Sequence, residues 1–281
     1  MSKAFNEVDS IAEFMNSNNL IVIDGLNLAF RYKHAKMKNY ATKYLETVQS
    51  LASSYAAKNI IVLADGGSIY REGIYSDYKG NRKELREKQT EEEAQDFKDF
   101  ITEFNKTLEL IDLSYPTIKF DGVEADDIAA YIVKYHSNDF DKIWLVSSDK
   151  DWDLLISEKT SRFSYVTRKE VTLENWSEHY DYEPDDHISI KVLAGDKGDN
   201  VPGVDGIGIK RAITLIKEYG TAFDIYDSLP IQSKYKYIKN LNEFNHNLLL
   251  NYELMDLVTY CDEALGKDNC TEVDRIIEER L

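Results

Sequence analysis

LIVID at residues 20–24 and IIVLAD at residues 60–65 are two short apolar runs, rich in β-branched side chains, that each end in an aspartate. Runs of this length and composition predict buried strands. The segment between them, residues 41–57, carries apolar side chains at helical spacing, namely Tyr44, Leu45, Val48, Leu51 and Tyr55. Strand, helix and strand in this order predict two parallel strands joined by a crossover helix.

The same alternation continues along the chain. Residues 117–120 predict a weak strand that leads into DGVEADD, residues 128–135 predict a helix, and residues 143–146 (IWLV) predict a fourth strand that runs into SSDKDWD. We therefore predict an α/β fold with a mostly parallel central sheet flanked by helices. In such a sheet ligands bind beyond the carboxyl ends of the strands, where Asp24, Asp65 and Asp149 are placed.

Beyond residue 183 the pattern becomes helical. The expected helices are residues 184–194, 210–219, 221–229 and 245–260. We divide the chain into a domain at residues 1–183 and a helical part at residues 184–281. No repeat or low-complexity tract separates them.

The segment from residue 79 to residue 113 is basic at first, then strongly acidic, and has helical propensity throughout. Phe97, Phe100 and Phe104 follow helical spacing and predict an aromatic stripe. Two interpretations stay open at this point. The segment is a helix docked on the sheet, or it is a projecting helical element that contacts substrate.

Composition limits the function. The 281 residues carry a net charge of −17, which argues against binding nucleic acid through the overall field of the protein. Two segments are nevertheless basic, residues 31–38 and residues 71–88. No apolar run approaches the ~18 residues of a membrane span, and the N-terminus lacks the layout of a signal peptide. The two cysteines, Cys261 and Cys270, have no zinc-ligand spacing, and we expect both to be reduced.

Nine carboxylates recur in compact groups, most of them after predicted strands or at helix starts. They are Asp24, Asp65, Glu124, Asp126, Asp127, Asp149, Asp151, Asp196 and Asp199. Taken singly, acids in a first helical turn or at a strand end are explained by the helix dipole or by capping. Five groups together are better explained by a bound cation, because clustered carboxylates repel one another unless neutralised.

Ligands that are all oxygen select hard ions, so we expect Mg²⁺ or Mn²⁺. Two such ions ~4 Å apart can activate water and stabilise the attacking and leaving oxygens of a phosphoryl displacement. The five histidines form no spaced ligand pair. No phosphate-binding loop of an NTPase and no nucleophile elbow is present, which disfavours those enzyme classes.

GVDGIGIKR at residues 203–211 precedes a predicted helix, so its glycines predict a tight turn between two helices. Backbone amides at Gly206 and Gly208 can approach a phosphate closely, and Lys210 and Arg211 add positive charge. A glycine turn between helices is also common without any ligand, so this motif alone leaves both interpretations open.

Six motifs in one order resemble the flap endonuclease family of structure-specific 5′ nucleases. They are DGLN at residue 24, YKGNR at residues 78–82, GVEADD at residues 122–127, SSDKDWD at residues 147–153, GDKGDN at residues 195–200 and GVDGIGIKR. The resemblance covers about residues 20–230. The short chain is similar to the free-standing bacteriophage type rather than to the domain fused to a polymerase.

The resemblance implies roles for these residues. Asp65, Glu124, Asp126 and Asp127 would serve one metal ion, Asp149, Asp151, Asp196 and Asp199 a second, with Asp24 near both. Lys79 and Arg82 would be catalytic, polarising the scissile phosphate at the base of a helical arch formed by about residues 79–113. The glycine turn would be a helix-hairpin-helix that holds a monovalent cation, K⁺, on carbonyls near Val204 and Ile207. Tyr78 would stack on a base.

We thus predict a two-metal nuclease that cuts DNA at 5′ flaps, branched junctions and 5′ ends in replication or repair. The alternatives are a metal-dependent RNase of the wider family, or a DNA clamp without chemistry. The expected DNA contacts are Arg31, Lys33, Tyr78, Lys83, Arg86, Gly206, Gly208, Lys210 and Arg211. We expect a monomer in the cytoplasm, that of the host if the chain is of phage origin, with no membrane partner; no motif identifies a replication protein as partner.

Overall fold

The computed structural model describes residues 17–281. The N-terminal stretch judged above for a signal peptide lies almost wholly outside the described residues. Six strands form one sheet in the order β3-β2-β1-β4-β5-β6. The first five are parallel and β6 is antiparallel to β5. The bounds are β1 Asn19–Asp24, β2 Ala57–Leu63, β3 Thr117–Ile118, β4 Ile143–Val146, β5 Thr160–Ser164 and β6 Lys169–Val171.

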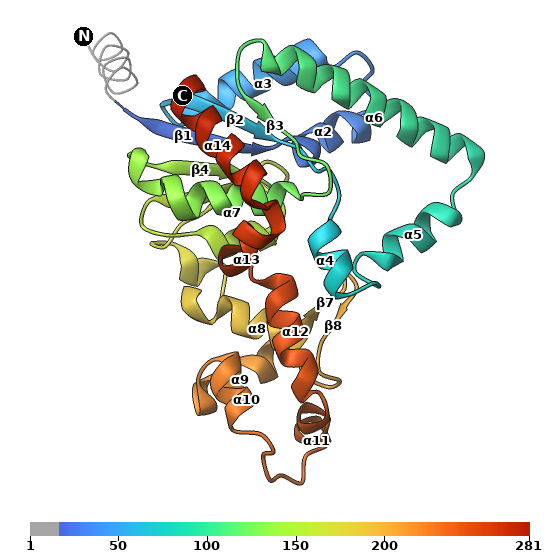
Figure 1. Cartoon of the computed structure of the whole chain (residues 1–281), viewed down its shortest axis with the longest axis vertical. Coiled ribbons are helices and arrows are strands. Elements are labelled where there is room, and N and C mark those ends of the chain that lie inside the picture. Colours follow the sequence, from blue (N-terminus) through green and yellow to red (C-terminus); the bar gives the residue numbers. More distant parts are fainter. Residues whose placement is uncertain (1–16) are drawn as a thin grey trace.

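Strand β1 is buried on both faces, which explains its unbroken apolar sequence. Leu20 and Val22 face one core cluster, while Ile21 and Ile23 face the other. The second of these faces is covered by α2 (Gly25–His34), α3 (Ala41–Ser54) and α6 (Glu91–Asp112). The first is covered by α7 (Ala125–His136), α13 (Leu257–Leu265) and α14 (Lys267–Arg280). The predicted α/β sheet flanked by helices is confirmed (Figure 1).

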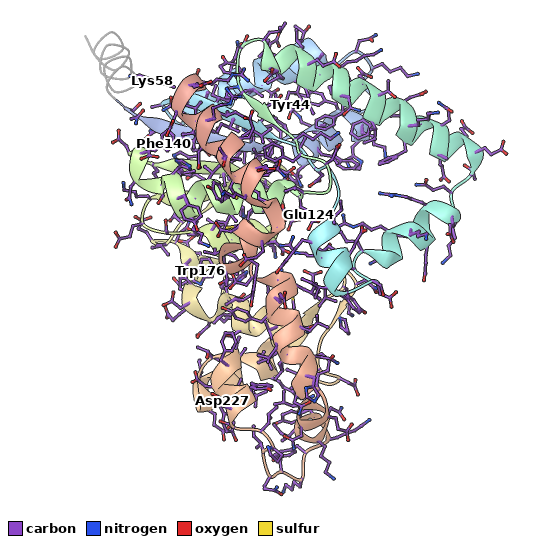
Figure 2. The ribbon with its side chains drawn as sticks, viewed as in Figure 1. Tyr44, Lys58, Glu124, Phe140, Trp176 and Asp227 are labelled. Atoms are coloured by element: carbon purple, nitrogen blue, oxygen red, sulfur yellow. The ribbon has the colours of Figure 1, made fainter. Side chains whose placement is uncertain are left out.

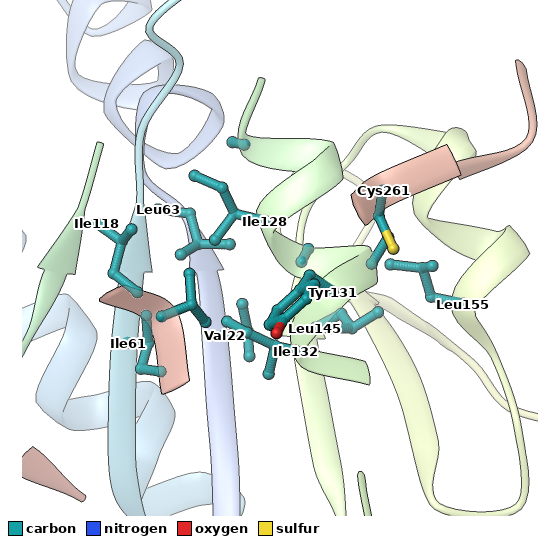
Figure 3. Packing of buried hydrophobic residues seen from close by; sticks show 14 of the residues in the cluster. Val22, Ile61, Leu63, Ile118, Ile128, Tyr131, Ile132, Leu145, Leu155 and Cys261 are labelled. Carbon is teal, nitrogen blue, oxygen red and sulfur yellow. The ribbon is translucent and has the colours of Figure 1, made fainter. Parts of the chain in front are cut away.

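The close packing of α7 on the sheet fixes the helix start beside the strand ends. Ile128 and Ile132 of α7 lie against Val22 of β1 and Leu63 of β2 in one buried cluster, which Cys261 of α13 also joins (Figure 3). Both cysteines are free thiols. Because α7 is anchored by so many apolar contacts, the acidic residues in its first turn are held in place.

A chain of helices leaves the sheet after β2. It consists of α4 (Ile69–Ile74), α5 (Gly80–Glu87) and α6. Helix α5 and the N-terminal end of α6 project away from the rest of the molecule (Figure 1). No residue of α5 is buried. The C-terminal half of α6 packs on the sheet instead, with Phe100 and Phe104 in the core. The docked interpretation holds for the C-terminal half of α6, whereas α5 projects, and its contact with substrate stays a prediction.

The acidic run Glu91–Glu93 begins α6. Thr90 accepts a hydrogen bond from the backbone N–H of Glu93, and the Glu93 carboxylate accepts one from the backbone N–H of Thr90. This capping box, with negative charges at the positive end of the helix, stabilises the first turn. The acidic run Glu91–Glu93 therefore serves to start a helix.

The helical part has a core of its own. Its elements are α8 (His187–Ala194), α9 (Ile209–Tyr219), α10 (Ala222–Asp227), α11 (Lys236–Glu243) and α12 (Asn245–Met255), with a two-stranded ribbon of β7 (Gly195–Asp196) and β8 (Val201–Pro202) after α8. Short 3-10 helices occur at Ser137–Asp139, Lys150–Leu155, Trp176–Glu178 and Pro184–Asp186.

The prediction of one helix over residues 245–260 is wrong. Asp256 interrupts it, because its carboxylate accepts from the backbone N–H groups of Val258 and Thr259 and so begins a new helix, α13. From there α13 and α14 return to the sheet rather than extending the helical part. Within residues 17–281 no helix combines the length and the apolar character that crossing a bilayer requires.

Candidate active site

The order of the strands reverses at β1, because later strands lie on both of its sides. The acidic groups meet beyond the end of this strand. β2 and β3 lie on one side of β1, while β4 and β5 lie on the other. The carboxyl end of β1 is therefore the switch point of the sheet, which is the usual ligand position in this architecture. Asp24 ends β1, caps α2 by accepting from the Asn27 N–H at 3.1 Å, and accepts from the Ser147 hydroxyl at 2.8 Å.

The neighbouring loops are fastened together. Gly66 after β2 donates its N–H to the carbonyl of Val123 at 2.8 Å, and Gly122 donates to the carbonyl of Gly66 at 2.8 Å. Asp65 accepts from the backbone N–H of Ala125 at 2.9 Å and so caps α7 from a different strand. Two aspartate-bearing loops that are far apart in the sequence are thereby held side by side.

Glu124 lies at the start of α7, beside α4 (Figure 2). Its Oε2 accepts from the Ser68 hydroxyl and from Arg71 Nη1, both at 2.8 Å, and its Oε1 contacts the Lys79 ammonium. Burial alone would raise the pKa of Glu124, but Lys79 and Arg71 outweigh burial and hold it below its ordinary value. Glu124 is thus charged in the folded protein.

Asp127 is held by a buried arginine. Both of its carboxylate oxygens accept from the Arg71 guanidinium at 2.7 Å, and both residues are almost completely buried. The two-point guanidinium contact uses one acceptor position on each carboxylate oxygen and leaves the other position on each free. In the structure Asp127 thus anchors Arg71, and its role as a metal ligand stays a prediction.

Two other acids of the first group, Asp24 and Asp126, have raised pKa values, so their charged forms are disfavoured without a cation. Burial, followed by the charge of Asp65, raises the pKa of Asp24 to about 7. Burial and the charge of Asp149 raise the pKa of Asp126 well above its ordinary value, although Asp126 accepts from Trp152 Nε1 at 2.6 Å. Like charges in a dry setting are costly, so this cluster favours a bound cation.

The second group surrounds a lysine of α8. Lys191 Nζ contacts Asp151 and lies 3.3 Å from Asp196 Oδ2. Asp196 also accepts from the backbone N–H groups of Gly198 and Asp199. Burial opposes ionisation of Asp196, but Lys191 holds its pKa below the ordinary value. Burial and the charge of Asp151 raise the pKa of Asp149, and Asp149 in turn raises the pKa of Asp126 in the first group. Asp149 therefore links the two groups.

The base of the projecting helices is fixed to this second group. Lys79 has a left-handed backbone (φ 54°), and its N–H donates to the carbonyl of Asp199 at 2.9 Å. Arg82 Nη2 lies 2.7 Å from Asp199 Oδ1. Burial would lower the pKa of Lys79, but Glu124 and Asp199 raise it. Lys79 is therefore charged, and both predicted catalytic side chains lie at the cluster.

The predicted stacking role of Tyr78 requires a correction. Its side chain is buried, with 6% exposure, and its hydroxyl donates to Glu124 at 3.2 Å and to Asp199 at 3.0 Å. The ring is packed with Val201 and Leu254, so it presents no free face for stacking on a base. Tyr78 therefore holds Glu124 and Asp199 by hydrogen bonds instead of stacking on a DNA base.

The chemistry of the donors fits divalent cations. Asp24, Asp65, Glu124 and Asp126 could hold one ion, and Asp149, Asp151, Asp196 and Asp199 another, through hard oxygen donors only. Among residues 17–281 no three acidic, histidine or cysteine side chains are placed so that they could close on an ion directly. The ammonium groups of Lys79 and Lys191 lie against the carboxylates, so both would move aside when an ion binds.

The other predicted contacts lie away from the cluster. Arg31 stacks on Tyr165 at 4.5 Å, and Lys33 lies 4.4 Å from the Phe97 ring. Lys83 and Arg86 are exposed on α5. In the helical part the predicted turn lies between α8 and α9, and Gly208 precedes α9, which carries an exposed Lys210 in its first turn. Arg211 contacts the carbonyl of Gly206.

Sequence reasoning missed several residues of the site. Ser68, Ser147 and Trp152 position carboxylates. Ser147 and Trp152 lie within the SSDKDWD motif, where attention went to the aspartates alone, and Ser68 lies in a stretch with no distinctive spacing. Arg71 was counted only as part of a basic segment. Lys191 left a usable signal, because it is the single charged residue within the apolar run ISIKVLA that leads into GDKGDN.

Comparison with known proteins agrees with this geometry. Residues 19–190 match the family described as 5′-3′ exonuclease, N-terminal resolvase-like domain, and residues 182–274 match 5′-3′ exonuclease, C-terminal SAM fold. The chain belongs to the 5′-3′ exonuclease family. It is 42% identical to the flap endonuclease of Escherichia phage T5 over 100% of this chain and 98% of that protein.

Solved structures give the same result. A crystal structure of a T5 protein co-crystallised with metal ions has a TM-score of 0.89 and 43% identity, covering 94% of this chain and 100% of that chain. A T5 flap endonuclease in a pseudo-enzyme–product complex with DNA and metal ions has a TM-score of 0.89 and 44% identity, covering 93% and 98%. The predicted family and nuclease class of this 5′-3′ exonuclease family member are confirmed.

Proposed function

We propose that this nuclease hydrolyses phosphodiester bonds of DNA at 5′ flaps, branched junctions and 5′ ends, using two divalent cations. The observation that supports this most is the joining of Asp24, Asp126 and Asp149 at the switch point, where their mutual repulsion calls for cations. A role in DNA replication or repair, where 5′ flaps and nicks arise, follows from that substrate.

The ions would be Mg²⁺ or Mn²⁺, held by the two carboxylate groups described above. When bound, they supply Lewis acidity and a water of lowered pKa. The chain's own residues do the rest. Asp65 and Glu124 hold the start of α7 against the strand ends, and Lys79 and Arg82, released from the carboxylates, bind the oxygens of the scissile phosphate.

The projecting helices supply the basis for choosing a 5′ single strand. Lys83 and Arg86 are exposed on α5, which buries no side chain. A strand that passes between α5, α6 and the cluster would meet positive charge from the arch before it reaches Lys79 and Arg82. Arg31 and Lys33 are further candidate phosphate contacts on the sheet side of this passage.

The helical part would grip duplex backbone without reading sequence. The amides near Gly206 and Gly208, with Lys210 and Arg211, are suited to a phosphate at the start of α9. We place a monovalent cation, K⁺, on the carbonyls near Val204 and Ile207. Affinity for duplex DNA measured in KCl and in tetramethylammonium chloride at equal ionic strength tests this, because only K⁺ would tighten binding.

We expect a cytoplasmic monomer. Free thiols at Cys261 and Cys270 suit a reducing compartment, and the substrate DNA is cytoplasmic in a bacterium or an infected host. Light scattering should give a mass near 32.4 kDa. A dimer mass, or recovery of the protein in the periplasmic fraction, would contradict these two points respectively.

The experiment that tests the substrate compares matched flaps of DNA and RNA, labelled at the 5′ end, with Mg²⁺ or Mn²⁺. We expect release of the DNA flap as one fragment cut at the junction, with a 5′ phosphate left on the duplex. Faster cutting of the RNA flap would favour the metal-dependent RNase, and binding without cutting would leave a clamp.

A further inference from the structure

A pocket with an unusual lining lies beside the carboxylate cluster. It encloses about 220 Å³ beyond the carboxyl ends of β4 and β5. Its lining includes Ser148, Lys150, Ser164, Thr167, Lys169 and His179, and no aspartate or glutamate. Four other pockets of the described residues each have at least one acidic side chain in their lining.

The absence of acid from this lining is notable in a chain with 51 acidic and 34 basic residues. Arg162 also lines the pocket, but its charge is balanced by Asp153, which lies 2.8 Å from Nη2. Within residues 17–281 neither Lys150 nor Lys169 forms an ion pair or a side-chain hydrogen bond. Their two positive charges are therefore available to an anion.

The floor of the pocket is built from ordered hydroxyl groups. The Ser164 hydroxyl lies 3.1 Å from that of Ser148, which also accepts from the backbone N–H of Val166 at 3.3 Å. Ser148 is itself held, because its N–H donates to Asn27 Oδ1 at 3.1 Å. Hydroxyl groups and ammonium groups around a small volume suit a phosphate group rather than an apolar ligand.

The position of the pocket suggests whose phosphate it is. Ser148 and Lys150 are the two neighbours of Asp149, so the pocket and the cluster share one loop. The sheet order puts β4 and β5 on one side of β1, and β2, from which the projecting helices leave, on the other. A nucleic acid that crosses the carboxyl edge with one phosphate at the cluster would bring another toward this pocket.

We propose that this pocket binds a phosphodiester group of the DNA substrate, on the side of the scissile bond away from the arch. Lys150 and Lys169 supply the charge, and His179 with the hydroxyl groups of Ser148 and Thr167 supplies further hydrogen bonds. The pocket thus adds a contact to duplex DNA on that side, besides the backbone contact proposed for the helical part. This inference rests on the proposed DNA substrate.

The test neutralises the two lysines. Lys150→Gln combined with Lys169→Gln should raise the Kd for a 5′-flap DNA about tenfold in chelator and leave kcat with Mg²⁺ within about twofold, since phosphate contacts set affinity and position. The slope of log K against log salt should become shallower by roughly one to two, because each lost contact removes about 0.9. Both lysines are exposed, so folding should be unchanged.

The matched control neutralises two lysines elsewhere, Lys58→Gln at the amino end of β2 (Figure 2) with Lys267→Gln on α14. It changes the net charge equally and should alter the Kd less than twofold. If the pocket variant behaves like this control, the pocket holds no phosphate of the substrate. If the unchanged protein fails to bind flap DNA, the proposed function itself fails, and this inference with it.

Shortened substrates locate the contact. The difference between the unchanged protein and the pocket variant should disappear when one of the two duplex arms is removed and persist when the other is removed. An equal difference with either arm removed would show a general charge effect and contradict a defined pocket.

Discussion

The backbone N–H of Lys79 donates to the carbonyl of Asp199 at 2.9 Å, although 120 positions separate the two residues. Further hydrogen bonds join the turn at residues 77–82 to the loop at residues 196–200. Asn81 Nδ2 donates to the carbonyls of Lys197 and Gly198, and Asn200 Nδ2 donates to that of Asp77. The base of the arch and the loop that carries two carboxylates therefore move as one body.

This coupling predicts a role for Asn81, which touches neither a carboxylate of the cluster nor, in the proposed mechanism, the phosphate. Asn81→Ala removes two hydrogen bonds to the loop, so Lys79 and Asp199 should lose their fixed separation. We expect kcat on a 5′ flap to fall about tenfold, since small misplacements of catalytic groups are costly. The Mg²⁺ concentration for half-maximal activity should rise as well.

A separate readout distinguishes positioning from general damage. Hydrogen exchange at residues 197–200 should speed up in Asn81→Ala, while the free energy of unfolding changes by no more than about 2 kcal/mol. Asn242→Ala, which removes two similar bonds to Ile231 in the helical part, is the control. If both variants keep full activity, the coupling has no catalytic role.

The buried contact between Arg71 and Asp127 predicts a stability effect without a loss of metal. Asp127→Asn leaves the Arg71 guanidinium partly unpaired in a dry site, so the free energy of unfolding should fall by about 3 kcal/mol. Calorimetric titration with Mn²⁺ should give the same number of bound ions as the unchanged protein. Loss of an ion in this variant would show instead that Asp127 is a metal ligand.

His187 predicts a dependence of stability on pH. Burial lowers its pKa from 6.5 to about 4, and its Nε2 has no hydrogen-bond partner among the described residues. Because the unfolded chain binds a proton at His187 below pH 6.5 and the folded chain does not until about pH 4, stability is constant above 6.5 and falls between these two values. The full loss from this residue is about 3 kcal/mol.

The measurement is the free energy of unfolding at pH 7 and pH 4.5, in chelator. His187→Gln keeps a partner for the Tyr182 hydroxyl, which lies 2.9 Å from His187 Nδ1, and should lose about 2 kcal/mol less than the unchanged protein between these two pH values. The exposed His246→Gln is the control. Equal acid sensitivity of all three proteins would show that His187 is already protonated at neutral pH or accessible to water.

The capping box at Thr90 predicts that the near end of the arch is ordered by local forces. Thr90→Ala should reduce the stability of the first turns of α6 by about 1 kcal/mol, which hydrogen exchange at residues 93–97 can detect. Thr221→Ala, at the equivalent capping box of α10, is a matched control for the size of the effect elsewhere. Unchanged exchange in the arch would mean that DNA-free α6 is held by other contacts.

Much of the site could be predicted because its chemistry is local in the sequence. β1, β2 and β4 contain continuous apolar runs that each lead to an aspartate, so the parallel sheet and the placement of Asp24, Asp65 and Asp149 at its carboxyl edge could be predicted. Their meeting depends on the strand order, in which β1 lies between β2 and β4. The glycine turn after α8 was visible for the same reason, since its backbone requirement is written in adjacent residues.

What could not be predicted depends on partners that are distant in sequence. Whether Asp127 faces an ion or Arg71 is decided by packing between α4 and α7, and the burial of Tyr78 is decided by α12 and the ribbon. The return of α13 and α14 to the sheet depends on the Asp256 cap, which resembles an ordinary acid within an apolar helix. The sequence did not predict β5 and β6, because both strands are short and largely polar.

The most direct test of the central claim, that the carboxylate cluster holds the ions that cut DNA, is cleavage of a 5′-labelled flap duplex by the unchanged protein and by Asp126→Asn. The asparagine keeps an acceptor for Trp152 but removes the charge. We expect junction cutting that requires Mg²⁺ and stops in chelator, a loss of about 10²-fold or more in Asp126→Asn, and unchanged DNA affinity in chelator. Cutting by Asp126→Asn at the rate of the unchanged protein, or cutting in chelator, would contradict the account.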